Sequence, residues 1–282
     1  MSALTLPASP GIHADSQLRF GGILRSEWIK LTSLRSTTWS LLTIVVVGVG
    51  LSLALAVTME SAGIPDQPSA RFALDILTIG VVFGQLVAAV LGVLAMSGEY
   101  STRMIQSTFA AVPMRLPVLA AKALVLFALV TVVGLITLFG SWAAAYPMFD
   151  ELDLAIGLEE PGFAMAMTGA SVYVGLTATF ALGIGVILRS AAGGIATVLG
   201  ILLILPIGLS MFGGSLEWFA SIPPYLLSSA GEAMSRIPEQ LPAGVDLRPG
   251  ALLNPWAGGL VVLAWTTVLL AIGALTLRGR DS

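Results

Sequence analysis

Six long apolar stretches without a charged residue place the strongest constraint on what this chain can fold into. A helix needs about 20 apolar residues to cross roughly 30 Å of hydrocarbon. The chain is 56% hydrophobic and only 10% charged, so a water-soluble core could not absorb this much apolar surface. We therefore predict an all-α polytopic membrane protein with six transmembrane helices. The predicted spans are Trp39 to Met59, Ile76 to Met96, Ala123 to Phe149, Phe163 to Leu188, Ser190 to Leu216 and Pro249 to Leu277.

The boundary between the fourth and fifth spans depends on the short sequence RSAAGG. Arg189 followed by Gly193 and Gly194 predicts a tight connection between two helices. The alternative is one helix of more than about 50 residues, which is longer than a span needs to be. Pro206 is predicted to kink the fifth span, because proline cannot donate a backbone hydrogen bond.

The distribution of Lys and Arg predicts the orientation of the spans. With the N-terminus in the cytoplasm, 10 of the 13 basic residues fall on the cytoplasmic side. Arg71, Arg236 and Arg248 are the three on the outside. Because cytoplasmic loops are enriched in Lys and Arg, we expect a multi-pass protein of the cell membrane with both termini in the cytoplasm.

Two kinds of segment precede the first span. Residues 1–17 lack periodicity and are predicted to form a flexible tail. Residues 18–38 are predicted to form an amphipathic connecting helix in the inner leaflet interface. Its apolar stripe is Phe20, Leu24, Trp28, Leu31 and Leu34. This helix could anchor the chain to lipid, present a docking surface to a cytoplasmic partner, or do both.

The remainder, residues 39–282, is predicted to be a single transmembrane domain with an outer insert at about 213–248. This insert is longer than a connector needs to be. Its aromatic and aliphatic residues predict one or two short helices at the outer membrane interface. Pro223 and Pro224 would begin a helix there, and Pro238 would end it. A lid over a central pathway and an inert cap are both compatible with this pattern.

The spans lack the groups that intramembrane chemistry requires. The predicted spans contain no Asp, Glu, Lys, Arg or His, and the chain contains no Cys. The sole histidine, His13, lies in the N-terminal tail, and no GxxxxGK[ST] motif is present to bind ATP phosphates. We therefore predict no catalytic, cofactor-binding or metal-binding residues in this chain, and we do not expect it to be an enzyme.

A few polar and small residues within the second span have simple structural interpretations. Gly80 and Gly84 form a GxxxG pattern, which favours close packing within the chain over dimerisation. Gln85 is expected to form a hydrogen bond with a neighbouring helix rather than bind a substrate.

The sequence GEYSTRMIQSTF follows the second span and is predicted to form a short, half-polar helix on the cytoplasmic side. Such a helix could protrude into a cleft of a soluble ATPase; a plain loop is the alternative. Glu99 lies where the span ends, close to apolar surroundings. We predict that Glu99 pairs with a basic residue or caps the N-terminus of a neighbouring helix.

These segments resemble the membrane subunits of ABC-2-type exporters, which have the type V ABC transporter fold. The similarity covers Leu18 to Ser282 and is carried by RSEWIKLTSLRSTTW, by GEYSTRMIQSTFAAVPMRLPVLAAK, by the outer insert, and by an ending, LAWTTVLLAIGALTLRGRDS, of the kind found in actinobacterial permeases. The chain departs from the family in having Ser101 and Thr102 where GT often follows the tyrosine.

The resemblance implies a permease subunit that works with separate ATP-binding subunits and with a second permease subunit, identical or different. ATP would bind to the partner, and substrate would pass through the seam between the two permease subunits. The implied coupling residues are Glu99, Tyr100, Arg103, Arg115, Glu27, Lys30 and Arg35. No nucleic-acid partner is expected, and the lipid bilayer is the surrounding medium.

A different class of function explains the missing catalytic residues equally well. A non-transporting membrane protein, such as an immunity or assembly factor that binds another membrane component, would also be apolar, polytopic and without its own ATP site. The transported substrate stays open, because an uncharged pathway suits amphipathic drugs, peptides and lipids alike. Export is the direction expected from the resemblance.

Overall fold

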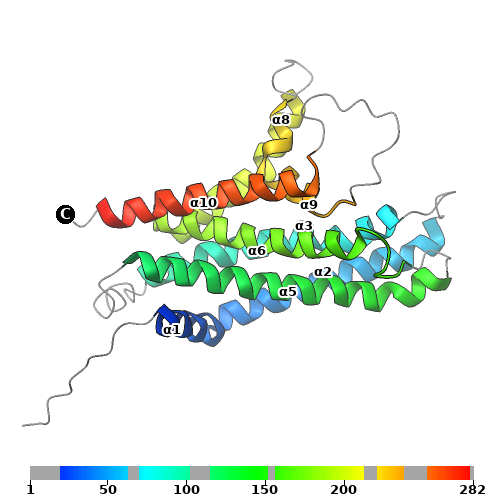
Figure 1. The fold of residues 1–282 in the computed structure, drawn as a ribbon, viewed down its shortest axis with the longest axis horizontal. Helices are drawn as coiled ribbons and strands as arrows, with labels where there is room; N and C mark the ends of the chain where they lie inside the picture. Colours follow the sequence, from blue (N-terminus) through cyan, green and yellow to red (C-terminus); the bar gives the residue numbers. More distant parts are fainter. Residues whose placement is uncertain are drawn as a thin grey trace, which may run out of the picture.

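The structure is a computed structural model that describes residues 20–62, 70–101, 115–151, 156–212, 221–237 and 253–279. Within these ranges, helices are the only regular secondary structure. Six stretches are long and apolar enough to cross a membrane, which confirms the predicted all-α polytopic fold. Figure 1 shows most of the long helices running alongside one another in an elongated bundle.

The helices follow the predicted order. A short helix, α1 (Phe20–Ser33), precedes four long helices, which are α2 (Arg35–Ala62), α3 (Ala70–Ser101), α5 (Arg115–Glu151) and α6 (Phe163–Leu188). The fifth span consists of α7 (Ala191–Leu199), a π-helical turn η1 (Gly200–Ile204) and α8 (Leu205–Phe212). Two short elements, η3 (Pro223–Tyr225) and α9 (Leu227–Met234), come before the last span, α10 (Pro255–Gly279).

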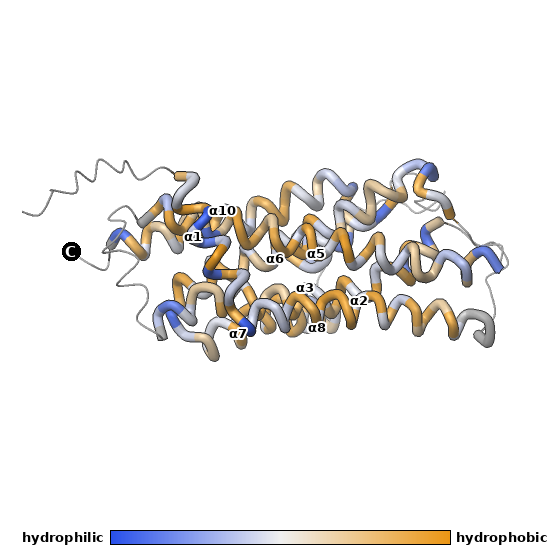
Figure 2. Tube along the Cα trace, turned by 90° about the horizontal axis from the view of Figure 1, so that it is seen from below, coloured by the Kyte–Doolittle hydropathy of each residue, from blue (hydrophilic) through white to orange (hydrophobic). Residues whose placement is uncertain are grey.

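Several helices extend beyond the charge-free stretches that predicted them. At its first turns α3 includes Arg71 and Asp75, and at its end it includes Glu99. The third span was predicted to begin at Ala123, but α5 begins at Arg115, so Lys122 lies within the helix. Figure 2 shows hydrophobic residues along the middle of the bundle and hydrophilic residues concentrated toward its two ends. The apolar stretches are therefore the central parts of longer helices whose ends carry charge.

The fourth span, α6, is the central helix of the bundle. Of its most apolar segment, 83% of the residues are buried, against 17% for the fifth span and 22% for the first and the sixth. α6 packs against α3, α5, α7, α9 and α10. Its sequence, FAMAMTGASVYVGLTATFALGIGVIL, has a small residue in nearly every turn. Small residues let neighbouring helices approach closely on several sides, which explains why α6 can be surrounded.

The closest helix contacts depend on glycine. A Cβ atom at Gly92 of α3 would overlap the backbone carbonyl of Ala178 in α6. A Cβ atom at Gly80 would lie 2.5 Å from the Cα atom of Gly48 in α2. The GxxxG pattern of the second span therefore serves packing within the chain, as predicted.

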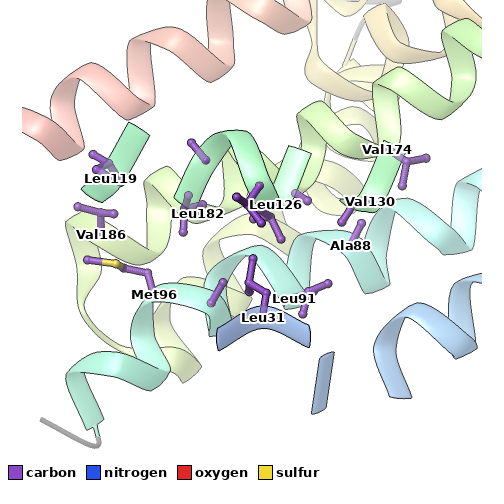
Figure 3. Packing of buried hydrophobic residues seen from close by; sticks show 14 of the residues in the cluster. Leu31, Ala88, Leu91, Met96, Leu119, Leu126, Val130, Val174, Leu182 and Val186 are labelled. Carbon is purple, nitrogen blue, oxygen red and sulfur yellow. The ribbon is translucent and has the colours of Figure 1, made fainter. Parts of the chain in front are cut away.

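A hydrophobic core fills the junction of α1, α2, α3, α5 and α6. Figure 3 shows Leu126 of α5 together with Leu91 of α3 and Leu182 of α6, and Leu31 of α1 beside Leu91. Leu31 belongs to the same buried cluster as these residues. The connecting helix is therefore joined to the bundle by apolar contact and not only by its covalent link to α2.

The connection between the fourth and fifth spans is as tight as predicted. α6 ends at Leu188, and Arg189 adopts a left-handed conformation with φ 53°. The side chain of Ser190 then caps α7 by accepting a hydrogen bond from the backbone N–H of Gly193. These two residues allow the chain to reverse without an intervening loop.

The fifth span contains an irregularity next to the predicted proline kink. The backbone N–H of Leu205 bonds to the carbonyl of Gly200, five residues earlier, which is the π-helical spacing. Pro206 follows immediately and has no N–H to continue the regular ladder. In Figure 1, α8 extends away from the bundle formed by the other spans.

The outer insert includes ordered helices in its described part. η3 begins at Pro223 and α9 ends at Met234, four residues before Pro238. α9 packs against α10 and α6, and most of its side chains are buried. The indole N–H of Trp265 donates to the backbone carbonyl of Tyr225 at 3.0 Å and fixes the start of this segment on α10.

Three predicted features lie outside the described residues. These are the tail at residues 1–17, all but the first four residues of the half-polar helix expected at residues 98–109, and the parts of the outer insert at residues 213–220 and 238–248. Those first four residues are the end of α3. The predicted connecting helix over residues 18–38 corresponds to α1, which ends at Ser33, while Arg35 begins α2.

The glycine contacts generate a stability prediction. Gly92→Ala should lower the free energy of unfolding by about 1–3 kcal/mol, because the added methyl group forces α3 away from α6. Gly50→Ala on α2 is the matched control, because a Cβ atom there meets nothing within 4 Å. Thermal unfolding of both variants in the same detergent checks this expectation. Equal melting temperatures for the two variants would contradict the close approach of α3 and α6.

Candidate functional site

Four charged side chains from three helices meet at the end of the bundle where α1 packs. The Nζ atom of Lys122 on α5 lies 2.6 Å from Oε2 of Glu27 on α1 and 2.7 Å from Oε1 of Glu99 on α3. The Nζ atom of Lys30 on α1 lies 2.7 Å from Oε1 of Glu27 and 3.4 Å from Oε1 of Glu99. Each ammonium group therefore contacts both carboxylates. We call these four residues the charge cluster.

The local sequence explains how each helix supplies its part. Glu27 and Lys30 are three residues apart, so they share one face of α1. Ile23, Glu27 and Leu31 recur every four residues and form the buried face of this helix. Ile23 packs against Val118 and Ala121 of α5, next to Lys122. The apolar contacts on both sides of Glu27 thus hold its carboxylate against Lys122.

Burial makes the charge cluster energetically demanding. Glu27 is 1% exposed and Lys122 is 2% exposed. An isolated charge at such a site would cost several kcal/mol, whereas two carboxylates and two ammonium groups together carry no net charge. Burial acts to lower the pKa of Lys30, but its hydrogen bond to Glu27 and the attraction of Glu99 raise the pKa by more. The pKa of Lys30 therefore lies above its ordinary value, and Lys30 stays charged at neutral pH.

A second contact joins the end of α3 to the connection between α6 and α7. The guanidinium carbon of Arg189 lies 5.1 Å from the centre of the Tyr100 ring, a cation–π distance. Tyr100 directly follows Glu99, so the last turn of α3 contacts α1 and α5 through one residue and Arg189 through the next. The last turn of α3 is therefore restrained both by α1 and α5 and by the connection between α6 and α7.

The structure brings together most of the predicted coupling residues that it describes. Glu27, Lys30 and Glu99 meet in the charge cluster, and the prediction that Glu99 pairs with a basic residue is confirmed. Tyr100 lies next to the cluster. Arg35 is exposed at the start of α2.

The other two predicted coupling residues cannot be placed with their side chains. Arg103 lies outside the described residues, and Arg115 begins α5 with no description of its side chain. Glu27 is too deeply buried to present a surface to a partner, so any part it plays in coupling comes from holding α1 in position.

Sequence reasoning missed Lys122 and Arg189 as members of this region. Lys122 was treated only as a cytoplasmic charge at the start of a span. A signal was present, because Lys122 stands between Ala121 and Ala123 in an otherwise apolar helical sequence. A lone cation in such a sequence needs a carboxylate partner. No comparable pattern in the sequence pairs Arg189 with Tyr100.

The charge cluster can hold helices together, but it offers no group for catalysis. Its ammonium groups already neutralise its carboxylates, so no free base or nucleophile is offered. Among the described residues there is no group of three or more His, Cys, Asp or Glu side chains that could hold a metal ion. In comparisons with known proteins, no family model and no curated protein matches the chain.

Removing one charge from the cluster should be costly. Lys122→Met leaves Glu27 buried with only Lys30 as a partner, and breaking a buried ion pair in this way costs about 3–5 kcal/mol. Arg25→Met is the matched control, because Arg25 is exposed on the opposite side of α1 from the buried face. Thermal unfolding in nanodiscs checks the difference. A Lys122→Met protein that is as stable as Arg25→Met would contradict the role of the cluster in stability.

The double variant tests whether pairing is the cause. Glu27→Gln combined with Lys122→Met removes both buried charges at their closest contact. We expect this protein to recover part of the stability lost in Lys122→Met, because no unpaired charge is left at that contact. A double variant that is less stable than the parent by the sum of the losses of the two single variants would indicate that the two residues act independently.

Proposed function

We propose that this chain is the membrane-spanning subunit of an ATP-driven exporter of the ABC-2 type, in which separate subunits bind and hydrolyse ATP. The observation that carries the proposal is the charge cluster. It attaches an amphipathic helix outside the spans to the end of α3 and the beginning of α5. A polytopic membrane protein without a phosphate-binding motif needs such an attachment if a soluble motor is to move its helices.

The geometry supports a specific path of coupling. α3 and α5 flank residues 102–114, which we propose as the contact with the ATP-binding subunit, together with the exposed surface of α1. Because Lys122 contacts carboxylates on both α1 and α3, a displacement of any one of these three helices would also displace the others. Glu99, Tyr100 and Lys30 would transmit this movement, while Arg103, Arg115 and Arg35 would provide charges at the contact surface.

The lightly buried spans support a second permease subunit. The fifth and sixth spans are 17% and 22% buried over their most apolar segments. Exposed apolar side chains occur along both of them, including Ile204, Met211, Trp256 and Leu260. These surfaces suit lipid or a second membrane subunit, and we propose that part of them forms the seam through which substrate passes.

ATPase coupling is the direct test of this function. The chain is purified from membranes of its native host, and ATP hydrolysis is measured in the fractions that contain it. We expect a co-eluting ATP-binding subunit whose hydrolysis is stimulated by the parent chain and by Arg25→Gln. Glu99→Gln should lose this stimulation, because it removes the negative charge that Lys30 and Lys122 share at the end of α3.

Two outcomes would contradict the proposal. Stimulation by Glu99→Gln equal to that of the parent would remove the charge cluster from the coupling path. The absence of any co-eluting ATPase, with another integral membrane protein present instead, would favour the immunity or assembly factor that the sequence also allowed.

The proposed orientation has its own test, which the absence of native cysteine makes clean. Single cysteines replace the exposed residues Ser33, at the end of α1, and Glu160, in the turn before α6. An impermeant thiol reagent added to intact cells should label the cysteine at 160 and leave the one at 33 unlabelled until the membrane is opened. Labelling of the cysteine at 33 in intact cells would reverse the proposed orientation.

A further inference from the structure

A pocket lies at the end of the bundle opposite the charge cluster. Its volume is about 430 Å³, within the range of sites that bind small molecules. One wall is a continuous face of α3 from Arg71 to Gln85, about 21 Å of helix at the usual rise of about 1.5 Å per residue. The opposite wall is the α9 segment and the residues that begin α10, and Tyr173 of α6 completes the lining.

A glycine allows this pocket to close around Tyr173. A Cβ atom at Gly231 of α9 would overlap the ring of Tyr173. The absence of a side chain at this position lets α9 lie directly on the ring. The hydrogen bond from Trp265 to Tyr225 holds the start of the same segment on α10. The pocket is thus formed where the α9 segment packs closely on α6 and α10.

The α3 wall of the pocket carries a polar side chain at the end farthest from Arg71. Gln85 is 6% exposed, and its Oε1 atom accepts a hydrogen bond from the hydroxyl of Tyr173. Gln85 lines the pocket, and its amide nitrogen Nε2 can donate a further hydrogen bond. A pocket wall that carries an amide donor favours a ligand with a hydrogen-bond acceptor.

The rest of the lining restricts the kind of ligand further. Aliphatic side chains, including Leu74, Val81 and Leu253, line the pocket together with Gln85. The charged residues of the lining come in pairs of opposite sign. Arg71 lies 3.9 Å from Asp75, and Arg236 lies 3.9 Å from Glu232, so both pairs are loose, and their side chains are 35% to 70% exposed. The part of the pocket that these pairs line suits a ligand with both a positive and a negative charge better than a simple anion or cation.

We propose that this pocket binds a short apolar peptide with free termini, with a backbone carbonyl accepting a hydrogen bond from Gln85. A peptide supplies acceptors along its whole length, apolar side chains for the aliphatic walls, and an ammonium and a carboxylate group for the paired charges. An alkyl chain of a lipid would leave the amide of Gln85 facing hydrocarbon. The proposal concerns binding by this chain alone and holds whether or not an ATP-binding subunit accompanies it.

Equilibrium binding of radiolabelled trileucine to the chain in nanodiscs tests the proposal. We expect saturable binding to the parent chain. Gln85→Met keeps a similar side-chain volume but removes the amide donor, and Val82→Trp fills the pocket. Each change should weaken binding by roughly tenfold or more. Phe83→Trp is the matched control, because Phe83 neighbours Val82 in sequence, is exposed, and does not line the pocket.

A second measurement does not depend on how well these variants fold. Thr78→Cys places a thiol in the pocket wall, and Glu160→Cys places one on the exposed turn before α6. Trileucine should slow the reaction of an aqueous thiol reagent at position 78 and leave the rate at position 160 unchanged. An alkylphosphocholine of similar length, which has no amide, should not protect position 78.

Three results would overturn the proposal. The first is the absence of saturable trileucine binding to the parent chain. The second is binding that Gln85→Met and Val82→Trp leave unchanged while both proteins keep the melting temperature of Phe83→Trp. The third is protection of position 78 by the alkylphosphocholine and not by trileucine, which would assign the pocket to a lipid.

Discussion

The burial of charge at one end of an otherwise apolar bundle determines how the parts of this protein are connected. Lys122 sits within a membrane-spanning helix with its side chain almost fully buried, and its ammonium group can be tolerated there only with carboxylate partners. Those partners come from α1 and from the end of α3. The ammonium group of Lys122 keeps both carboxylate partners only while α1, α3 and α5 remain in contact. These ion pairs therefore attach the connecting helix to the spans.

The same helix that ends in the charge cluster also forms a wall of the pocket at the other end. α3 carries Asp75, Gln85 and Glu99 along one uninterrupted helix. Gly92 lies between the two sites and brings the backbone of α3 into direct contact with α6. Because closely packed helices move as rigid bodies more readily than they bend, a displacement at Glu99 would reach the pocket wall through α3. This arrangement offers a physical route between the proposed contact with an ATP-binding subunit and the proposed peptide pocket.

The sequence was sufficient to predict the elements whose cause is local. Apolar stretches of about 20 residues predict spans whatever their neighbours are, and all six were found. The reversal at Arg189 and the helix after Pro223 also follow from nearby residues. The irregular turn before Pro206 was predicted as a kink, although a π-helical spacing from Gly200 to Leu205 could not be foreseen from the presence of proline alone.

Features that depend on contacts between distant segments were predicted less well. Glu99 was expected to pair with a base, but ten basic residues were predicted on the same side of the membrane. The apolar neighbours of Lys122 indicated that it needs a carboxylate partner, but not which one. The buried face of α1 was also not predicted from the sequence, because it contains a glutamate. Ile23, Glu27 and Leu31 form that face, whereas the apolar stripe in the sequence includes Phe20 and Trp28, which are exposed.

The distance between α1 and the rest of the bundle is the most direct test of this account. Spin labels on cysteines at Gly22, in α1, and at Ala192, in α7, report this distance by pulsed electron paramagnetic resonance in nanodiscs; both positions are exposed. The account predicts one narrow distance distribution in the parent chain and a broad one in Lys122→Met, because α1 loses its buried partner. A distribution that stays narrow and unshifted in Lys122→Met would contradict the claim that the charge cluster holds the connecting helix in place.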